Sequence, residues 1–164
     1  PTLFVCENNF YSVYSPLKVR QPKGREIYKM VEALGVESTL VDGNDIEAAY
    51  AAALAAIEHV RSGHGPFFLE LTTYRWLEHC GPNYDNDIGY RSEEEFQKWK
   101  AKDPIPAYES LLITRGWITQ VDINAIRTEL SIEVDAAFEF AEASLYPAQE
   151  EAYTSLYADS RELT

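Results

Sequence analysis

A carboxylate and two side-chain amides follow the first apolar run of the chain. Leu3-Phe4-Val5 has the composition of a short strand that is buried on both faces of a sheet. Glu7, Asn8 and Asn9 come next and disfavour a continuing strand. In an open α/β sheet, ligands bind at the carboxyl ends of the strands. Amide and carbonyl oxygens at that end suit Mg²⁺, which keeps few protein ligands and takes the others from phosphate and water.

The same asparagines allow a purely structural interpretation. Asn after a strand commonly closes an Asx turn, in which its side-chain oxygen accepts a hydrogen bond from the backbone two residues on. The local pattern by itself favours this turn over a ligand site. Other segments of the chain shift the balance toward a ligand.

An arginine and a histidine follow the third predicted strand, residues 67–74. In a parallel sheet, Arg75 and His79 would emerge at the same edge as Asn9. Arginine forms bidentate hydrogen bonds with phosphate oxygens, and histidine can donate a hydrogen bond or transfer a proton near neutral pH. With the side-chain oxygen of Asn9 and the carbonyl oxygen of Tyr11 on Mg²⁺, this set suits a diphosphate. Ordinary surface hydrogen bonding is the alternative for an Arg or a His on a loop.

The elements that must position these residues alternate between strands and helices. The predicted order is a strand at Leu3-Phe4-Val5, a helix near 25–34, a strand at Thr39-Leu40-Val41, a helix after Asp45, and the strand 67–74. Gly35 ends the first helix and Asp45 caps the second. This order predicts an α/β fold over residues 1–91, with a parallel sheet and flanking helices. Asn44, which follows the second strand, would lie at the same sheet edge.

Residues 92–164 are predicted to form an all-helical, acidic tail. Ser92 opens a helix through a capping box, Pro106 restarts a helix after the Asp103-Pro104 break, and Thr119 caps a longer helix over 120–144. We expect its apolar stripe to pack on the sheet domain or on a partner subunit. The stripe consists of Ile126, Leu130, Val134, Phe138 and Ala141. The terminal Tyr153, Leu156 and Tyr157 form either a buried anchor or a frayed helix.

Composition and charge narrow the class of protein. The chain has 164 residues, of which 46% are hydrophobic and 25% charged, as in a soluble globular domain. Its net charge of −13 argues against nucleic acid as a partner. No apolar run approaches the roughly 20 residues of a membrane-spanning helix, and no signal peptide opens the sequence. We expect a cytoplasmic or organellar-matrix protein in which Cys6 and Cys80 are reduced.

Basic residues crowd the segment after the asparagines. They are Lys18, Arg20, Lys23, Arg25 and Lys29. One interpretation is a solvated loop and helix face, and the other is a positive rim near an anionic ligand.

Five segments occur in an order and spacing that carry a family resemblance. They are Cys6-Glu7-Asn8-Asn9-Phe10-Tyr11, Val41-Asp42-Gly43-Asn44-Asp45, Thr73-Tyr74-Arg75 with His79, Gly89-Tyr90-Arg91-Ser92, and Lys102-Asp103-Pro104-Ile105. With these segments the chain resembles the alpha subunit of the thiamine-diphosphate-dependent dehydrogenase component in 2-oxo acid and acetoin dehydrogenase complexes. The resemblance runs the whole length of the chain and implies the carboxyl-terminal part of such a subunit.

The resemblance implies a role for each matched residue. Asn9 would bind Mg²⁺ through its side chain, and Tyr11 through its backbone carbonyl. Arg75 would contact the diphosphate of the cofactor, and Ser12 would be a further cofactor-binding residue. His79 would lie near the diphosphate and the active-site entrance, where it would assist catalysis.

The sequence departs from the family pattern in three places. The Gly-Asp-Gly segment, whose Asp is a third metal ligand in the family, would lie upstream of the asparagines and is absent from this sequence. The Gly-His-Ser motif is replaced by Glu78-His79-Cys80, and Gly89 stands at the position of a second regulatory serine. Regulatory phosphorylation therefore has no acceptor at either place.

The implied activity is oxidative decarboxylation of a 2-oxo acid, or cleavage of acetoin, with transfer of the acyl group to lipoamide. The implied assembly is an α2β2 enzyme, whose beta subunit activates the cofactor and whose product is passed to the lipoyl domain of the acyltransferase component. One alternative is an inactive fragment that keeps the fold without binding cofactor. Another is a transketolase-like thiamine-diphosphate transferase, which needs no lipoyl partner.

Overall fold

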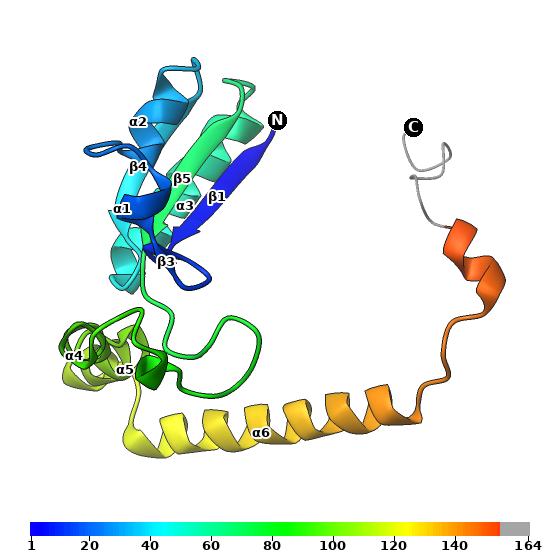
Figure 1. Cartoon of the computed structure of the whole chain (residues 1–164). Helices are drawn as coiled ribbons and strands as arrows, with labels where there is room; N and C mark the ends of the chain where they lie inside the picture. Colours follow the sequence, from blue (N-terminus) through cyan, green and yellow to red (C-terminus); the bar gives the residue numbers. More distant parts are fainter. Residues whose placement is uncertain (155–164) are drawn as a thin grey trace. The chain divides into compact units, whose positions relative to one another are not determined.

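The computed structural model describes residues 1–154, and the chain divides into two compact units, Pro1–Thr114 and Arg115–Thr164 (Figure 1). The predicted boundary at residues 91 and 92 is therefore not where the units divide. The reason is that helix α4, Glu93–Lys100, packs its aromatic rings onto the first unit. Phe96 and Trp99 of α4 both contact the ring of Tyr74.

The first unit is built on a parallel sheet of three strands in the order β1-β5-β4 (Figure 1). The strands are β1 (Leu3–Asn8), β4 (Glu37–Asp42) and β5 (Phe67–Thr72). Their register places Asn8, Thr72 and Asp42 side by side at the carboxyl ends. The segments that follow the strands therefore leave from one edge of the sheet, as predicted.

Two helices cover opposite faces of this sheet. Ala56 and Val60 of α3, Ile46–Arg61, form the buried core with Phe67 of β5. Helix α2, Ile27–Glu32, meets Glu70 of the same strand. Successive side chains of a strand point to opposite faces, so Phe67 and Glu70 lie on opposite faces of β5. Helix α3, which packs on Phe67, and helix α2, which contacts Glu70, therefore cover different faces of the sheet. The predicted α/β arrangement, a parallel sheet with flanking helices, is confirmed.

The burial predicted for the first strand is wrong. Phe4 and Val5 are 51% and 54% exposed, although Leu3 packs against the core. In the second strand Leu40 is also 41% exposed. Both β1 and β4 lie at an edge of the three-stranded sheet, where a strand has a neighbour on one side only. Only the central strand β5 has the burial of a core strand, with Leu69 1% exposed.

Most predicted helix boundaries are confirmed by their caps. Asp45 accepts a hydrogen bond from the Ala48 N–H at the start of α3, and Ser92 does the same for the Glu95 N–H in α4. Gly35 follows α2 with a φ of +83°, which glycine adopts at little cost. Helix α5, Pro104–Thr114, begins at Pro104 rather than at Pro106. Proline suits a first helical position because no N–H is needed there.

Short elements complete the first unit. They are β2 (Tyr11–Ser12), β3 (Ser15–Pro16), α1 (Leu17–Arg20) and the 3-10 helix η1 (Asn86–Ile88). Strands β2 and β3 pair antiparallel, directly after the asparagines. The polar segment between β5 and α4 contains η1 and is otherwise irregular, as its composition predicts.

The second unit contains α6, Gln120–Ala143, and the 3-10 helix η2, Gln149–Tyr153. Thr119 caps α6 in a capping box with Asp122. The apolar stripe of α6 is exposed, and Phe138 is 67% accessible. That this stripe packs on the sheet domain or on a partner subunit therefore stays a prediction. Among the described residues, no helix is long and apolar enough to cross a membrane.

Residues 92–154 contain no strand; outside their helices they are turns, bends and irregular backbone. The predicted helical tail extends to residue 164, and its last ten residues lie outside the described part. Leu156 and Tyr157 belong to that segment. Tyr153 is 82% exposed, so it is not a buried anchor within the described part of the chain.

Candidate functional site

Both asparagines form Asx turns where β1 ends. The Asn8 side-chain oxygen accepts a hydrogen bond from the Phe10 N–H at 3.0 Å, and that of Asn9 accepts one from the Tyr11 N–H at 3.0 Å. The structural interpretation of these residues is therefore confirmed. It does not compete with metal binding, because an amide oxygen has a second lone pair. The second turn joins Asn9 and Tyr11, the two predicted metal ligands, by a direct hydrogen bond.

The backbone of this segment adopts two uncommon conformations. Phe10 has a φ of +65° and Val13 a φ of +57°, values that bulky and β-branched residues rarely take. Each such residue costs about 1–3 kcal/mol and persists only where surrounding contacts hold it. Phe10 is held by the Asn8 turn, and Val13 by a hydrogen bond from Arg75 Nη2 to its carbonyl oxygen at 3.0 Å.

Arg75 lies next to the β2–β3 hairpin that follows the asparagines, at the sheet edge where it was predicted, but protein groups already bind its guanidinium. Besides the Val13 carbonyl, Arg75 Nη2 contacts the Tyr90 hydroxyl at 2.9 Å and lies 4.0 Å from an Asp85 carboxylate oxygen. Arg75 Nε is buried without a hydrogen-bond partner among the described residues. The position of the Arg75 guanidinium is thus already set by protein groups.

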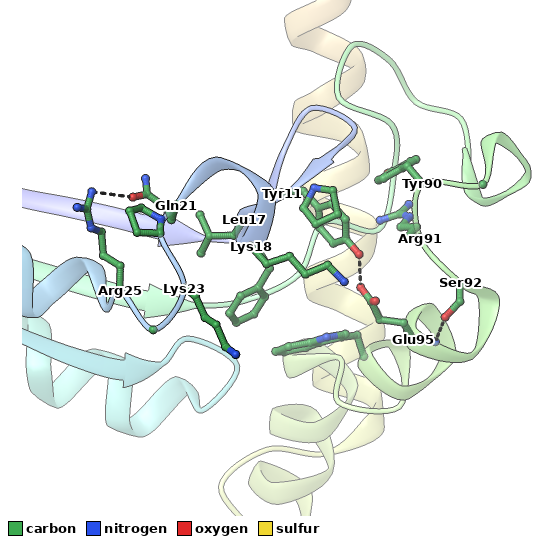
Figure 2. A pocket seen from close by; sticks show the side chains of 16 residues that line it. Tyr11, Leu17, Lys18, Gln21, Lys23, Arg25, Tyr90, Arg91, Ser92 and Glu95 are labelled. Atoms are coloured by element: carbon green, nitrogen blue, oxygen red, sulfur yellow. Dashed lines mark hydrogen bonds between the residues drawn. The ribbon is translucent and has the colours of Figure 1, made fainter.

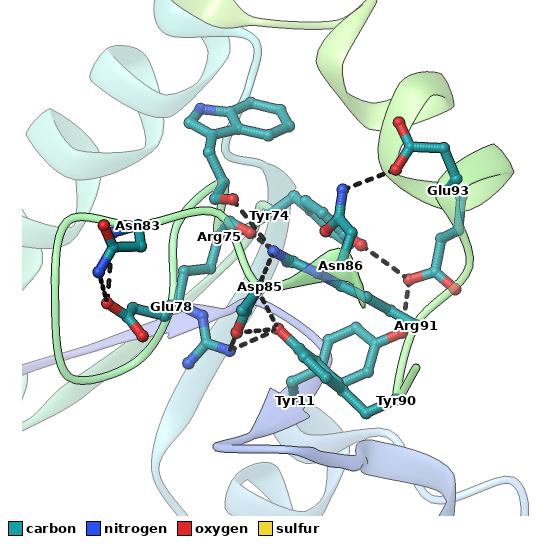
Figure 3. A network of polar contacts seen from close by, with 12 residues as sticks. Tyr11, Tyr74, Arg75, Glu78, Asn83, Asp85, Asn86, Tyr90, Arg91 and Glu93 are labelled. Atoms are coloured by element: carbon teal, nitrogen blue, oxygen red, sulfur yellow. Dashed lines mark hydrogen bonds and ion pairs between the residues drawn. The ribbon is translucent and has the colours of Figure 1, made fainter. Parts of the chain in front are cut away.

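A buried ion pair lies next to Arg75 (Figure 3). Arg91 Nη2 donates to Asp85 Oδ1 at 2.6 Å, and the two residues are 5% and 2% exposed. Arg91 also donates to the backbone carbonyls of Arg75 and Trp76 at 2.5 and 3.0 Å. The Tyr90 hydroxyl contacts both carboxylate oxygens of Asp85 at 3.0 and 2.9 Å. This network fixes the two ends of the 75–91 loop to each other.

A half-buried carboxylate on α4 joins this network to the asparagine hairpin. Glu95 Oε1 accepts hydrogen bonds from the hydroxyls of Tyr11 at 2.6 Å and Tyr74 at 3.2 Å. Burial, followed by the charge of Glu95, raises the pKa of Tyr74 to about 12. Burial and the hydrogen bond to Glu95 raise the pKa of Tyr11 as well. Both tyrosines therefore remain hydrogen-bond donors at any physiological pH.

This arrangement predicts how stability depends on alkaline pH. The pKa of Tyr74 is higher in the folded than in the unfolded state, where tyrosine titrates near 10. The protonated Tyr74 hydroxyl therefore contributes its full share of the free energy of unfolding below pH ~10, and this share is lost as the pH rises toward ~12. Tyr74→Phe should cost about 1 kcal/mol at neutral pH by removing one hydrogen bond, and should flatten the fall of melting temperature across that alkaline range. Equal alkaline slopes in thermal scans of parent and variant would contradict this.

The remaining predicted site residues are exposed. Ser12 lies in β2 with its side chain accessible, and His79 is exposed on the loop. His79 makes no hydrogen bond, ion pair or ring contact with any described residue. The structure thus brings Asn9, Tyr11 and Arg75 to one edge of the first unit but shows no contact between them and His79. Its predicted catalytic role stays a prediction.

A pocket of 1070 Å³ adjoins the hairpin (Figure 2). It is lined by aromatic residues from the hairpin and α4, including Phe10, Tyr11 and Trp99. Three of the five crowded basic residues line it as well, namely Lys18, Lys23 and Arg25. In Figure 2 the Lys18 side chain extends toward Glu95. This lining fits the positive-rim interpretation of the basic segment for these three residues.

The other two basic residues are held at the surface. Arg20 donates to the Ser15 hydroxyl at 3.3 Å, and Lys29 pairs with Glu26 on α2. These contacts fit the alternative of a solvated surface.

The donor chemistry near Asn9 matches Mg²⁺ only in part. Asn9 and Tyr11 offer neutral oxygens of the hard type that Mg²⁺ prefers. In the described part of the chain, no three His, Cys, Asp or Glu side chains are grouped so that they could hold a metal ion. The two oxygens would therefore serve as part of a ligand set that phosphate and water complete.

Several residues of the site were not predicted. Asp85 stands among four Asn and Asp residues between positions 83 and 87, and nothing in that pattern marks it as the buried one. Glu95 follows two further glutamates in the first turn of α4. Arg91 belongs to a segment that carried the family resemblance, and this was the only signal for it.

The comparisons with known proteins agree on one family. A sequence profile described as "Dehydrogenase E1 component" matches residues 1–150. The pyruvate dehydrogenase E1 component subunit alpha of Rickettsia bellii is 32% identical over 157 residues, which are 96% of this chain and 47% of that protein. The same subunit of Rhizobium meliloti is 32% identical over 157 residues, covering 95% and 44%. The chloroplastic subunit alpha-3 of Oryza sativa subsp. japonica is 31% identical over 161 residues, covering 98% and 37%.

The chain spans about half the length of the curated relatives it matches. That the chain corresponds to their carboxyl-terminal part, as the resemblance implied, stays a prediction. The profile match covers 150 of the 164 residues and shows the family. The chain belongs to the dehydrogenase E1 component family.

Proposed function

We propose that this chain is part of the alpha subunit of an enzyme that uses thiamine diphosphate to decarboxylate a 2-oxo acid oxidatively. The acyl group would pass to lipoamide. The observation that supports this most is that the Asn9 turn lies at the same sheet edge as Arg75, which donates a hydrogen bond to Val13 of the same segment, in a member of the E1 family. The relatives are named pyruvate dehydrogenase subunits, so pyruvate is the first substrate to test. Acetoin is the second.

Each residue would have a distinct task. The Asn9 side chain and the Tyr11 carbonyl would hold Mg²⁺, and Arg75 would contact the diphosphate through the part of its guanidinium that faces away from Val13. Ser12 would bind the cofactor from the exposed side of β2. When bound, thiamine diphosphate supplies the carbanion chemistry that breaks the bond beside the oxo group. His79 would donate a hydrogen bond or a proton at the entrance.

The local charge supports an anionic ligand. The whole chain carries −13, yet Lys18, Lys23 and Arg25 gather along one pocket next to Tyr11. A positive rim in an acidic protein concentrates anions at that place.

The exposed apolar surfaces support a partner subunit. The α6 stripe includes Ile126, Leu130 and Phe138, which are 49%, 52% and 67% exposed. Isolated apolar residues at a surface are ordinary, but a stripe along one helix is typical of an interface. We assign it to the beta subunit of an α2β2 assembly, which would also complete the active site. The lipoyl domain of the acyltransferase would be the second partner, in the cytoplasm or an organellar matrix.

Titration calorimetry separates this proposal from an inactive fragment. The full-length alpha subunit, assembled with its beta subunit, should bind thiamine diphosphate in the presence of Mg²⁺. The 164-residue chain by itself should not. No binding by the assembly would contradict the proposal. Acylation of a lipoyl domain with pyruvate then excludes a transketolase-like transferase, which would leave that domain unmodified.

Asn9→Ala should weaken thiamine diphosphate binding by at least about tenfold at limiting Mg²⁺. The estimate is a lower bound, since even residues outside the ligand shell change metal affinity by about 10- to 100-fold. Asn9→Asp is the matched control because it keeps an oxygen that accepts from the Tyr11 N–H. It should retain binding. If the alanine variant binds the cofactor as tightly as the parent does, Asn9 is not a ligand.

A further inference from the structure

We propose that Glu70 is a positioning residue that orients the Asn8 and Asn9 turns and couples them to helix α2. Glu70 lies in the central strand β5 and is 3% exposed. A carboxylate so completely removed from water is costly unless hydrogen bonds satisfy its oxygens. No step of the proposed reaction uses it.

Each carboxylate oxygen of Glu70 binds a different segment. Oε1 accepts a hydrogen bond from the Asn8 side-chain amide at 2.6 Å, across 62 residues of sequence. Oε2 accepts one from the Tyr28 backbone N–H at 2.9 Å, across 42 residues. Hydrogen bonds to an ionised carboxylate are shorter and stronger than those between neutral groups. Glu70 therefore ties the end of β1 to the start of α2.

The bond to Glu70 decides which way the Asn8 amide faces. With Nδ2 toward the carboxylate, Oδ1 is directed to the Phe10 N–H, which it accepts at 3.0 Å. The opposite orientation would place an amide oxygen against a carboxylate and an NH₂ group against a backbone N–H. Both contacts would be repulsive. Only one orientation of Asn8 is thus compatible with Glu70.

The orientation of Asn8 in turn sets the spacing of the two proposed metal ligands. Phe10, with a φ of +65°, lies between Asn9 and Tyr11, and its N–H is held by Asn8. Without that bond, Phe10 would relax from a conformation that is costly for a bulky residue. The Asn9 side chain and the Tyr11 carbonyl would then lose their fixed relation.

The second oxygen of Glu70 replaces a missing helix cap. Glu26, the N-cap residue of α2, makes no capping hydrogen bond with its side chain. Glu70 instead accepts from Tyr28, the second residue of the helix. Residues Lys23 and Arg25 of the pocket lie just before this helix. The buried Glu70 carboxylate thus connects the turn that carries the proposed Mg²⁺ ligands with the basic residues that line the pocket.

This inference rests on the proposed function, and Glu70→Gln in the full-length assembly with the beta subunit tests it. The glutamine side chain has one oxygen for two donors, the Asn8 amide and the Tyr28 N–H. Its NH₂ group must therefore face one of these donors. We expect the Mg²⁺ concentration for half-maximal thiamine diphosphate binding, measured by calorimetry, to rise about tenfold or more. Glu58→Gln, the same change at an exposed position of α3, should leave it unchanged.

A double variant restores the hydrogen bonds with donor and acceptor exchanged. In Asn8→Asp combined with Glu70→Gln, the amide at position 70 donates to a carboxylate at position 8 and still accepts from Tyr28. The Mg²⁺ dependence should return toward the parent value. A Glu70→Gln variant that melts earlier yet shows the parent's Mg²⁺ dependence would overturn the proposal, because Glu70 would then stabilise the fold only.

A second measurement keeps the two proposals distinguishable. Hydrogen–deuterium exchange of the 8–12 segment in the assembly without cofactor should be faster in Glu70→Gln than in the parent and in Glu58→Gln. Unchanged exchange would overturn the positioning role, whatever the cofactor does. If the parent itself binds no thiamine diphosphate while exchange accelerates as expected, the proposed function fails and the control of the turn by Glu70 stands.

Discussion

Replacing Asp85 by alanine is expected to lower the free energy of unfolding of the assembled protein by about 3–5 kcal/mol, because it leaves a buried guanidinium without its anion. Asp85 and Arg91 are 2% and 5% exposed and lie 2.6 Å apart. Solvent therefore screens neither charge. The Tyr90 hydroxyl, which donates to the Asp85 carboxylate, would lose this acceptor in the same variant.

Asp87→Ala is the matched control for this experiment. Asp87 lies two residues away in η1 and is exposed, so its removal should change stability by no more than about 0.5 kcal/mol. Thermal or urea denaturation of both variants gives the comparison. If Asp85→Ala unfolds like Asp87→Ala, the ion pair contributes nothing measurable and the 75–91 loop is held by other contacts.

In the proposed enzyme, His79→Ala should slow acylation of the lipoyl domain by about 100-fold while leaving thiamine diphosphate affinity nearly unchanged. The magnitude is that of a positioned proton donor or acceptor. The selectivity follows from the structure, in which His79 is exposed and makes no hydrogen bond, ion pair or ring contact with any described residue. Its removal costs the fold little, so the melting temperature should stay within about a degree of the parent.

Cys80→Ala provides the neighbouring control. Cys80 is exposed and has a free thiol, and it occupies the same loop. Its replacement should leave the acylation rate unchanged. Equal losses of rate and of cofactor affinity in His79→Ala would assign the histidine to cofactor binding instead of catalysis. Equal rates in His79→Ala and the parent would remove it from the mechanism.

The sequence by itself determined the order of elements and the edge at which the site lies. Strand and helix periodicity along the chain predicted a parallel sheet, and parallel strands bring the residues that follow them to a common edge. The capping residues Asp45, Ser92 and Thr119 were predicted correctly, because a cap involves residues only three positions apart. Interactions between residues so close in sequence can be predicted from the sequence.

Only the tertiary structure decided how the side chains at that edge are engaged. Arg75 was predicted as a phosphate ligand, yet its guanidinium also supports Val13, 62 residues earlier in the chain. Glu70 looked like one polar residue in an apolar strand, and its partners Asn8 and Tyr28 come from two other segments. Burial likewise depended on the number of neighbours that each strand has in the sheet. Such pairings join residues that are distant in sequence, and no local pattern encodes which carboxylate will meet which donor.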